Sequence, residues 1–216
     1  MNTDFAREQM IKQQVRAWDV LDEDVLRILS EVPREDFVSP EFAALAFADV
    51  EIPLPNGQSM MTPTVEGRVL QALGLKGTER VLEIGTGSGF LTACLAKLSA
   101  HVTSIDIYDD FLKSAADRLE QQGTDNVELL AMDATESLPD GTFDAIAVTG
   151  SIQKFDPRLV GALAPNGRLF VIVGNPPAME AKLVVRTNDK DWQSETQFET
   201  NVAPLINGFL PPQFSF

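Results

Sequence analysis

The sequence is poor in the side chains that most often carry nucleophilic or metal-dependent chemistry. Its 216 residues include one cysteine, Cys94, and one histidine, His101. A single cysteine cannot form an internal disulfide, and Cys94 falls in an apolar helical pattern that predicts a core position. His101 begins a short β-prone segment, for which we expect a structural role. Since no Cys and His residues have metal-ligand spacing, the sequence predicts neither a metal site nor a Cys–His nucleophile.

Basic residues are also scarce. The chain has 17 Lys and Arg residues against 32 Asp and Glu residues, a net charge of −15 at pH 7. Binding to nucleic acid or to anionic lipid requires a basic surface, so we expect neither a nucleic-acid partner nor a membrane partner. No apolar run approaches about eighteen residues, and residues 1–4 are polar rather than a charged and apolar leader. We therefore expect a cytoplasmic protein.

The composition is that of a globular domain. Hydrophobic residues make up 44% and charged residues 23% of the chain, and 216 residues can bury a full core. We find no internal repeat, low-complexity tract or linker. The sequence therefore predicts a single domain over residues 1–216.

The most informative stretch is residues 81–90, Val-Leu-Glu-Ile-Gly-Thr-Gly-Ser-Gly-Phe. A short apolar run, alternate glycines and a following helical pattern predict a strand, a tight loop and a helix. Glycine is needed where the backbone turns with positive φ or where a ligand comes close. The dinucleotide fingerprint has its third glycine one residue later, at the place of Phe90. The stretch indicates a loop for a nucleotide-like cofactor, although a merely tight turn would have the same glycines.

Acidic residues follow three successive predicted strands. They are Glu83, Asp106 and Asp133, and Asp106 follows Gly85 by about twenty residues, the offset of a ribose-binding acid. Each acid alone could be a solvated strand end or a helix N-cap. Because the carboxyl ends of parallel strands line one crevice, together they favour a ligand with hydroxyls, an amine and a positive charge. S-adenosylmethionine fits this description better than a dinucleotide, whose pyrophosphate the acids would repel.

The N-terminal part predicts helices that cap the rest. Apolar spacing predicts one helix over residues 5–18, and Asp22 can cap a second helix that Pro33 ends. Residues 33–51 are predicted to be irregular with short helical turns, anchored by Phe37, Phe42, Leu45 and Phe47. Residues 52–57 are turn-rich. Thr62 suits an N-cap and Pro63 the first position of the next helix.

From Arg80 the sequence alternates between strand and helix patterns. Helices are predicted at 90–99, 108–122 and 157–164, and the intervening apolar strands predict a parallel sheet buried on both faces. Residues 182–187 and 195–203 predict a final antiparallel pair. The apolar tail, residues 209–216, is expected to pack on its own domain or on a partner, which makes it a candidate homodimer contact.

Several segments together resemble the protein-L-isoaspartate O-methyltransferase family. They are residues 32–38, 55–58, 81–95, 143–149 and 166–174, and the resemblance runs from about residue 7 to about residue 208. The glycine loop alone resembles class I S-adenosylmethionine-dependent methyltransferases in general. The Pro-Arg-Glu-Asp-Phe-Val and Asn-Gly-Gln segments make the family match specific.

The resemblance implies an α/β fold with a doubly wound, mostly parallel, seven-stranded Rossmann-like sheet. A helical cap and substrate loop would occupy residues 1–62 and the α/β core residues 63–216. It implies S-adenosylmethionine as donor and carboxyl methylation of L-isoaspartyl residues, a protein-repair reaction, on a protein or peptide acceptor. Cofactor contacts are then expected from Glu83, Ile84, Gly85, Thr86, Gly87, Ser88, Gly89, Asp106, Ile107, Asp133, Ala134 and Thr149.

One departure from the family concerns the acceptor. The family loop Gly-Gln-Thr-Ile-Ser, whose serine lies beside the transferred methyl group, corresponds to residues 57–61, so Met61 replaces the hydroxyl. A thioether cannot donate a hydrogen bond, and Ser59 and Thr62 carry the nearby hydroxyls. Ser59, Met61 and Thr62 are therefore the candidate catalytic residues. We expect weak or no isoaspartyl activity and a gain from Met61→Ser.

Three functions remain open at this point. The first is isoaspartyl methylation, in which an ionised carboxylate needs positioning rather than a base. The second is the same donor site with another acceptor, a small molecule or another protein group. The third is a non-catalytic binding or regulatory protein. Residues 132–134 and 149–151 also depart from the family, and donor binding should tolerate these changes better than acceptor recognition.

Overall fold

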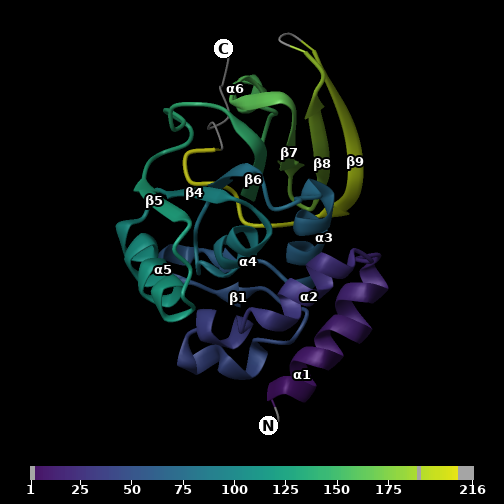
Figure 1. Cartoon of the computed structure of the whole chain (residues 1–216), viewed down its shortest axis with the longest axis vertical. Helices are drawn as coiled ribbons and strands as arrows, with labels where there is room; N and C mark the ends of the chain where they lie inside the picture. Colours follow the sequence, from purple (N-terminus) through teal and green to yellow (C-terminus); the bar gives the residue numbers. More distant parts are fainter. Residues whose placement is uncertain (1–2, 189–190, 209–216) are drawn as a thin grey trace, which may run out of the picture.

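The computed structural model describes residues 3–188 and 191–208. The apolar tail at 209–216, with its predicted packing, lies outside the described residues. A seven-stranded sheet runs through the molecule in the order β5-β4-β3-β6-β7-β8-β9 (Figure 1). Its strands are β3 Arg80–Ile84, β4 His101–Asp106, β5 Val127–Ala131, β6 Phe143–Ile152, β7 Leu163–Asn175, β8 Ala178–Arg186 and β9 Trp192–Thr200.

The pairing of the strands confirms the predicted Rossmann-like sheet. Strands β5, β4, β3, β6 and β7 are parallel, and β8 and β9 add an antiparallel pair at one edge. Helices α3 Pro63–Leu73, α4 Phe90–Leu98, α5 Asp109–Gln121 and α6 Pro157–Gly161 alternate with the strands. The carboxyl ends of the parallel strands therefore meet at one edge of the sheet.

Alternate side chains of each central strand enter different cores. Val81, Ala145 and Ala147 pack in the core that contains α3, α4 and α5, whereas Leu82 and Ile146 pack in the core that contains α6. Burial on both faces is the reason that these strands are almost continuously apolar.

The N-terminal segment forms two helical stretches, as predicted. It comprises α1 Thr3–Gln9, a π-helical stretch Met10–Val15 and a 3₁₀ turn Arg16–Trp18, followed by α2 Glu23–Glu31. The Asp22 side chain caps α2 by accepting hydrogen bonds from the backbone N–H groups of Asp24 and Val25. In Figure 1 these purple helices lie together beside α3, at one end of the molecule.

Between the cap and the core, a short hairpin shapes the loop predicted to meet the acceptor. Strand β1 Ile52–Pro53 pairs with β2 Ser59–Met60, and the loop between them turns through positive φ at Asn56 and Gly57. Thr62 and Pro63 then begin α3 as predicted, with the Thr62 hydroxyl accepting from Val65 N–H at 3.4 Å. The hairpin fixes residues 59–61 directly before a rigid helix.

Two predictions about the fold were wrong, one on the burial of Leu45 and one on the end of α6. Leu45 is 37% exposed rather than an anchor, because the short 3₁₀ helix Pro40–Leu45 lies at the surface and Ala46 takes the buried place. Helix α6 ends at Gly161 rather than 164, because Leu163 already pairs with Phe143 as the first residue of β7. Tertiary strand pairing thus decides the end of α6.

None of the helices in the described part of the chain combines the length and the apolar character needed to cross a bilayer. Within the same residues, no group of His, Cys, Asp and Glu side chains could hold a metal ion. Cys94 is fully buried, as its helical position predicted.

Candidate functional site

A cavity opens at the carboxyl ends of β3, β4 and β6. Its lining includes all but one of the predicted cofactor residues: Glu83, Ile84, Gly85, Thr86, Gly87, Ser88, Asp106, Ile107, Asp133, Ala134 and Thr149. The exception is Gly89, which begins α4 with a φ of 85° and faces Ala115 of α5. Ser59 and Met61 also line the cavity, whereas Thr62 does not, since its hydroxyl caps α3 and contacts Thr64.

The glycine loop is held against β6 by Thr149. The Thr149 hydroxyl lies 2.9 Å from the Ile84 carbonyl oxygen and 2.7 Å from that of Gly85. Gly85 has a φ of 102°, and a Cβ added to it would lie 2.2 Å from the Thr149 Oγ1. Only glycine fits this conformation and this contact. The loop is therefore shaped to bring its backbone close to whatever occupies the cavity.

Asp106 joins the end of β4 to the glycine loop. Its Oδ2 accepts a hydrogen bond from the Gly87 N–H at 2.9 Å, and its Oδ1 accepts one from the Tyr108 N–H at 3.0 Å. Burial raises the pKa of the Asp106 carboxyl, and the backbone hydrogen bonds act in the opposite direction. The carboxyl is thus fixed in orientation at the rim of the cavity.

Glu83 is a buried carboxyl group with one unused oxygen. Its Oε2 accepts hydrogen bonds from the Thr92 and Ser104 hydroxyls, each at 2.5 Å, while Oε1 is buried without a hydrogen-bond partner. Burial raises the pKa of Glu83 to about 8, against the effect of these two hydroxyls. An unpartnered acidic oxygen in a closed site is a place for a cationic or hydrogen-bond-donating group of a ligand.

The raised pKa of Glu83 predicts how the stability of the fold depends on pH. Its pKa rises from 4.5 to about 8 on folding, so between these values the folded state binds more protons than the unfolded state. Stability must therefore fall as the pH rises through this window. We expect the melting temperature of the ligand-free protein to fall between about pH 5 and pH 8, and Glu83→Gln to reduce that fall. An equal fall in both proteins, measured by calorimetry, would contradict this prediction.

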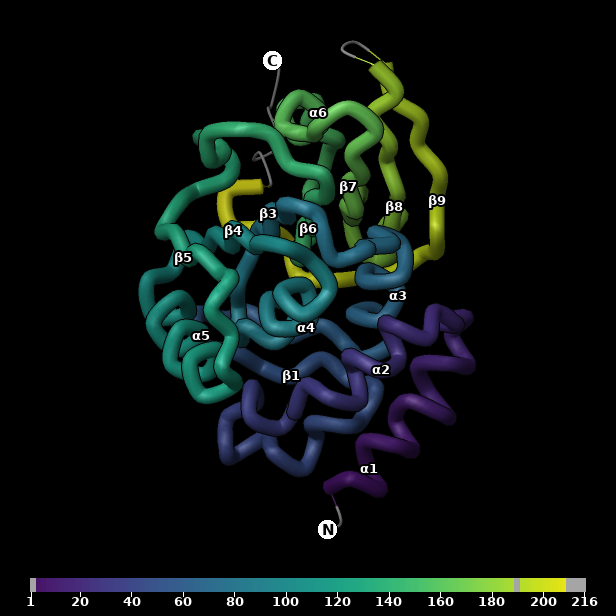
Figure 2. Tube along the Cα trace, viewed as in Figure 1, coloured from purple at the N-terminus to yellow at the C-terminus, as the bar shows by residue number. Residues whose placement is uncertain are grey.

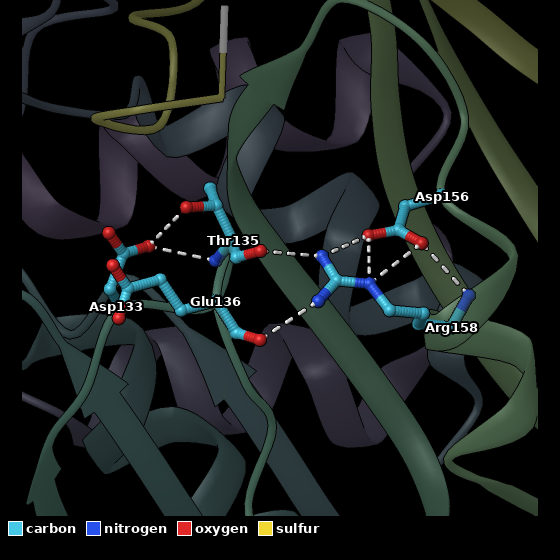
Figure 3. A network of polar contacts seen from close by, with 5 residues as sticks. All are labelled: Asp133, Thr135, Glu136, Asp156 and Arg158. Atoms are coloured by element: carbon cyan, nitrogen blue, oxygen red, sulfur yellow. Dashed lines mark hydrogen bonds and ion pairs between the residues drawn. The ribbon is translucent and has the colours of Figure 1, made fainter.

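The turn after β5 is held by Arg158, which lies at the start of α6 (Figure 3). The Asp133 Oδ1 accepts from the Thr135 N–H at 2.8 Å and from its hydroxyl at 2.6 Å. Arg158, paired with Asp156, donates to the carbonyl oxygens of Thr135 at 2.9 Å and Glu136 at 3.2 Å. This clamp fixes the turn that lines the cavity.

Asp133 is also tied to the C-terminal segment. The Asn207 side-chain N–H donates to the Asp133 Oδ2 at 2.7 Å. Burial opposes ionisation of Asp133, but the hydrogen bonds from Thr135 and Asn207 outweigh it and hold its pKa below the usual value. Both carboxylate oxygens are thus engaged within the protein, so the turn offers the cavity mainly its backbone and Ala134.

Residues 203–206 form a wall of the cavity that the sequence did not predict. The segment is bound to the end of β6, where the Ser151 N–H donates to the Ala203 carbonyl and the Leu205 N–H to the Ser151 carbonyl, each at 2.9 Å. Figure 2 shows this yellow segment running from β9 back across the sheet toward β3 and β4. Nothing in its local sequence marks it as part of a site.

Beside the loop predicted to meet the acceptor, the structure adds a buried contact between Arg34 and Glu66 that the sequence did not predict. The Ser59 hydroxyl donates to Glu51 at 3.0 Å. Arg34, fully buried, donates to the Met61 carbonyl oxygen at 2.6 Å, and its Nη2 lies 3.2 Å from the Oε2 of Glu66. Glu66 lines the cavity together with Met61. Arg34 belongs to the Pro-Arg-Glu-Asp-Phe-Val segment. The match of this segment to the family is the sequence feature that could have pointed to Arg34 as a residue of the site.

The sequence of the chain is similar to sequences of known proteins. The model of the family Protein-L-isoaspartate(D-aspartate) O-methyltransferase (PCMT) matches residues 5–209. A protein-L-isoaspartate O-methyltransferase of Koribacter versatilis is 35% identical over 214 residues, covering 97% of this chain and 96% of the relative. One from Anaeromyxobacter sp. is 40% identical over 182 residues, covering 83% and 84%.

A solved structure shares the fold over the whole chain. A Plasmodium falciparum protein in complex with S-adenosyl-L-homocysteine superimposes with a TM-score of 0.78 at 20% identity, covering 95% of this chain and 98% of that one. The likeness extends over the helical cap as well as the sheet.

Proposed function

Since the chain belongs to the protein-L-isoaspartate O-methyltransferase family, we propose that it methylates the α-carboxylate of L-isoaspartyl residues in proteins and peptides, with S-adenosylmethionine as donor. The observation that carries this proposal is the single cavity in which the predicted cofactor residues meet the loop predicted for the acceptor. The test described below also distinguishes the two alternatives, methylation of a different acceptor and a non-catalytic role.

The residues present fit S-adenosylmethionine. The free Oε1 of Glu83 suits the ammonium group of its methionine part, and the bare backbone at Gly85 allows close approach. We assign the ribose hydroxyls to Asp106 and the adenine to the turn of Asp133 and Ala134. The cofactor supplies a methyl group on a positively charged sulfur. The acidic lining suits that charge.

The contribution of the chain to the reaction is positioning. The acceptor carboxylate, with an ordinary pKa near 4, is already ionised at neutral pH, so no residue has to remove a proton. The cavity would have to bring the acceptor oxygen to the donated methyl group, and the walls formed by residues 59–61 and 203–206 would restrict water. Among the described lining residues there is no histidine or cysteine, as this mechanism allows.

The test is methyl transfer from radiolabelled S-adenosylmethionine to a synthetic isoaspartyl peptide. We expect label in the peptide as a base-labile ester. Cofactor binding without transfer to this peptide would indicate a different acceptor. Failure to bind the cofactor would indicate a non-catalytic protein.

Met61→Ser tests the acceptor side. The new hydroxyl would donate a charge-assisted hydrogen bond to the acceptor carboxylate, so we expect kcat/KM for the isoaspartyl peptide to rise severalfold while cofactor affinity is unchanged. Met132→Ser is the matched control, because it places a hydroxyl on the β5 side of the same cavity. Activity that rises equally in both variants, or in neither, would assign no acceptor role to position 61.

A further inference from the structure

Glu66 is a cavity-lining carboxyl group for which the proposed reaction has no use so far. It lies in the first turns of α3, it is 2% exposed, and it lines the cavity beside Met60 and Met61. Its Oε2 is buried and takes part in no hydrogen bond. A buried carboxyl oxygen without such a bond is costly and needs a reason.

The guanidinium of Arg34 fixes Glu66 next to the acceptor loop. Its Nη2 lies 3.2 Å from the Glu66 Oε2, but it donates its hydrogen bond to the Met61 carbonyl oxygen at 2.6 Å. The Nη1 contacts the Met60 sulfur at 3.4 Å, and the guanidinium lies over the ring of Phe90, 5.1 Å from its centre. One buried cation thus joins α3, the loop at residues 59–61 and the start of α4.

The part of the cavity near residues 58–61 offers an anionic acceptor few hydrogen-bond donors and no positively charged lining residue. The described lining residues include four acids, Glu66, Glu83, Asp106 and Asp133, and no Lys, Arg or His. Ser59 directs its hydroxyl to Glu51, the Gln58 amide donates to the Asn56 carbonyl oxygen at 3.4 Å, and Met61 has no donor. An ionised Glu66 would repel a carboxylate placed beside Met61, whereas a neutral Glu66 could donate a hydrogen bond to it.

We propose that Glu66, as a neutral carboxylic acid held by Arg34, donates the hydrogen bond to the acceptor carboxylate that a hydroxyl at position 61 would otherwise supply. The inference rests on the proposed function and names a recognition residue for its acceptor. It also removes the basis for expecting weak activity, because the donor missing at Met61 is supplied from the next helix.

The charges around Glu66 are compatible with a neutral acid. Burial raises the pKa of Glu66 to about 8, Arg34 lowers it and Glu83 raises it. Burial also raises the pKa of the nearby Cys94 thiol, so the thiol is neutral. The carboxylate of Asp49 accepts a hydrogen bond from the Thr64 hydroxyl on α3. Since the proton is required, acceptor recognition must be lost as the pH rises through about 8.

The experiment compares the wild type with Glu66→Gln, Glu66→Leu and the double variant Glu66→Leu/Met61→Ser. For each protein, kcat/KM for an isoaspartyl peptide is measured between about pH 6 and pH 9.5. Calorimetry gives the affinity for S-adenosylmethionine and, with S-adenosylhomocysteine present, the affinity for the peptide. Thermal melting reports folding.

We expect Glu66→Leu to lose about tenfold in kcat/KM and in peptide affinity at pH 7, with cofactor affinity unchanged. The double variant should regain most of this loss. Glu66→Gln keeps an N–H donor that does not titrate, so its activity should stay near that of the wild type and no longer decline above about pH 8.

Wild-type activity in Glu66→Leu, or the same pH profile in Glu66→Gln and the wild type, would overturn the inference and leave the proposed function intact. No transfer by the wild type to the isoaspartyl peptide would refute the proposed function itself. If Glu66→Leu leaves Arg34 unpaired and does not fold, the pH profile of Glu66→Gln still decides between the outcomes.

Discussion

Replacing Asp106 with alanine is expected to weaken the binding of S-adenosylmethionine by about 1.5–3 kcal/mol, the range for hydrogen bonds to a charged group. The carboxyl is held at the end of β4 by the backbone N–H groups of Gly87 and Tyr108, so its orientation is fixed before it meets the ribose hydroxyls that we assign to it. Alanine removes both the ligand contact and the tie to the glycine loop.

The matched control is Asp109→Ala. Asp109 is exposed at the start of α5 and does not line the cavity, so this variant removes the same charge nearby without touching the site. Titration calorimetry should show a loss of affinity for Asp106→Ala only. Equal affinities of Asp106→Ala and the wild type would refute the ribose assignment.

Gly85→Ala is expected to damage both folding and cofactor binding. The added Cβ would lie 2.2 Å from the Thr149 Oγ1, and a φ of 102° is unfavourable for alanine. Backbone strain of this kind costs about 1–3 kcal/mol, to which the displacement of Thr149 adds. Because Thr149 holds the loop through the carbonyl groups of Ile84 and Gly85, the loop must shift and cofactor affinity should fall with stability.

Gly77→Ala separates the effect of backbone strain from the effect of the contact with Thr149. Gly77 has a similar φ of 90°, but an added Cβ would meet nothing within 4 Å. It should lower the melting temperature through strain alone and leave the affinity for S-adenosylmethionine unchanged. If Gly85→Ala behaves like Gly77→Ala in both measurements, the contact with Thr149 has no role in shaping the cofactor loop.

The grouping of the predicted cofactor residues around one cavity could be anticipated because the signals for it are local. The glycine spacing at 85, 87 and 89 and the acids at the ends of successive strands depend on short stretches whose geometry is fixed by a strand, a turn and a helix. The alternation of apolar strand patterns with helix patterns likewise identified the parallel strands, and the residues after them identified the final antiparallel pair.

The features that the sequence missed depend on contacts between distant segments. Arg34 meets Glu66 and Met61 only after the helical cap has packed on α3, and Arg158 reaches the turn of Asp133 from α6. The wall at residues 203–206 joins the cavity through pairing with Ser151. Neither spacing nor composition encodes such contacts.

Acceptor recognition is tested most directly by a pair of peptides that differ in one linkage, L-isoaspartyl in one and ordinary aspartyl in the other. Both are incubated together with the protein and S-adenosylmethionine, and mass spectrometry locates the added methyl group. We predict a methyl ester on the isoaspartyl peptide, followed by the succinimide formed from it, and no change in the aspartyl peptide. Methylation of neither peptide by a protein that binds S-adenosylmethionine, or equal methylation of both, would contradict the proposed function.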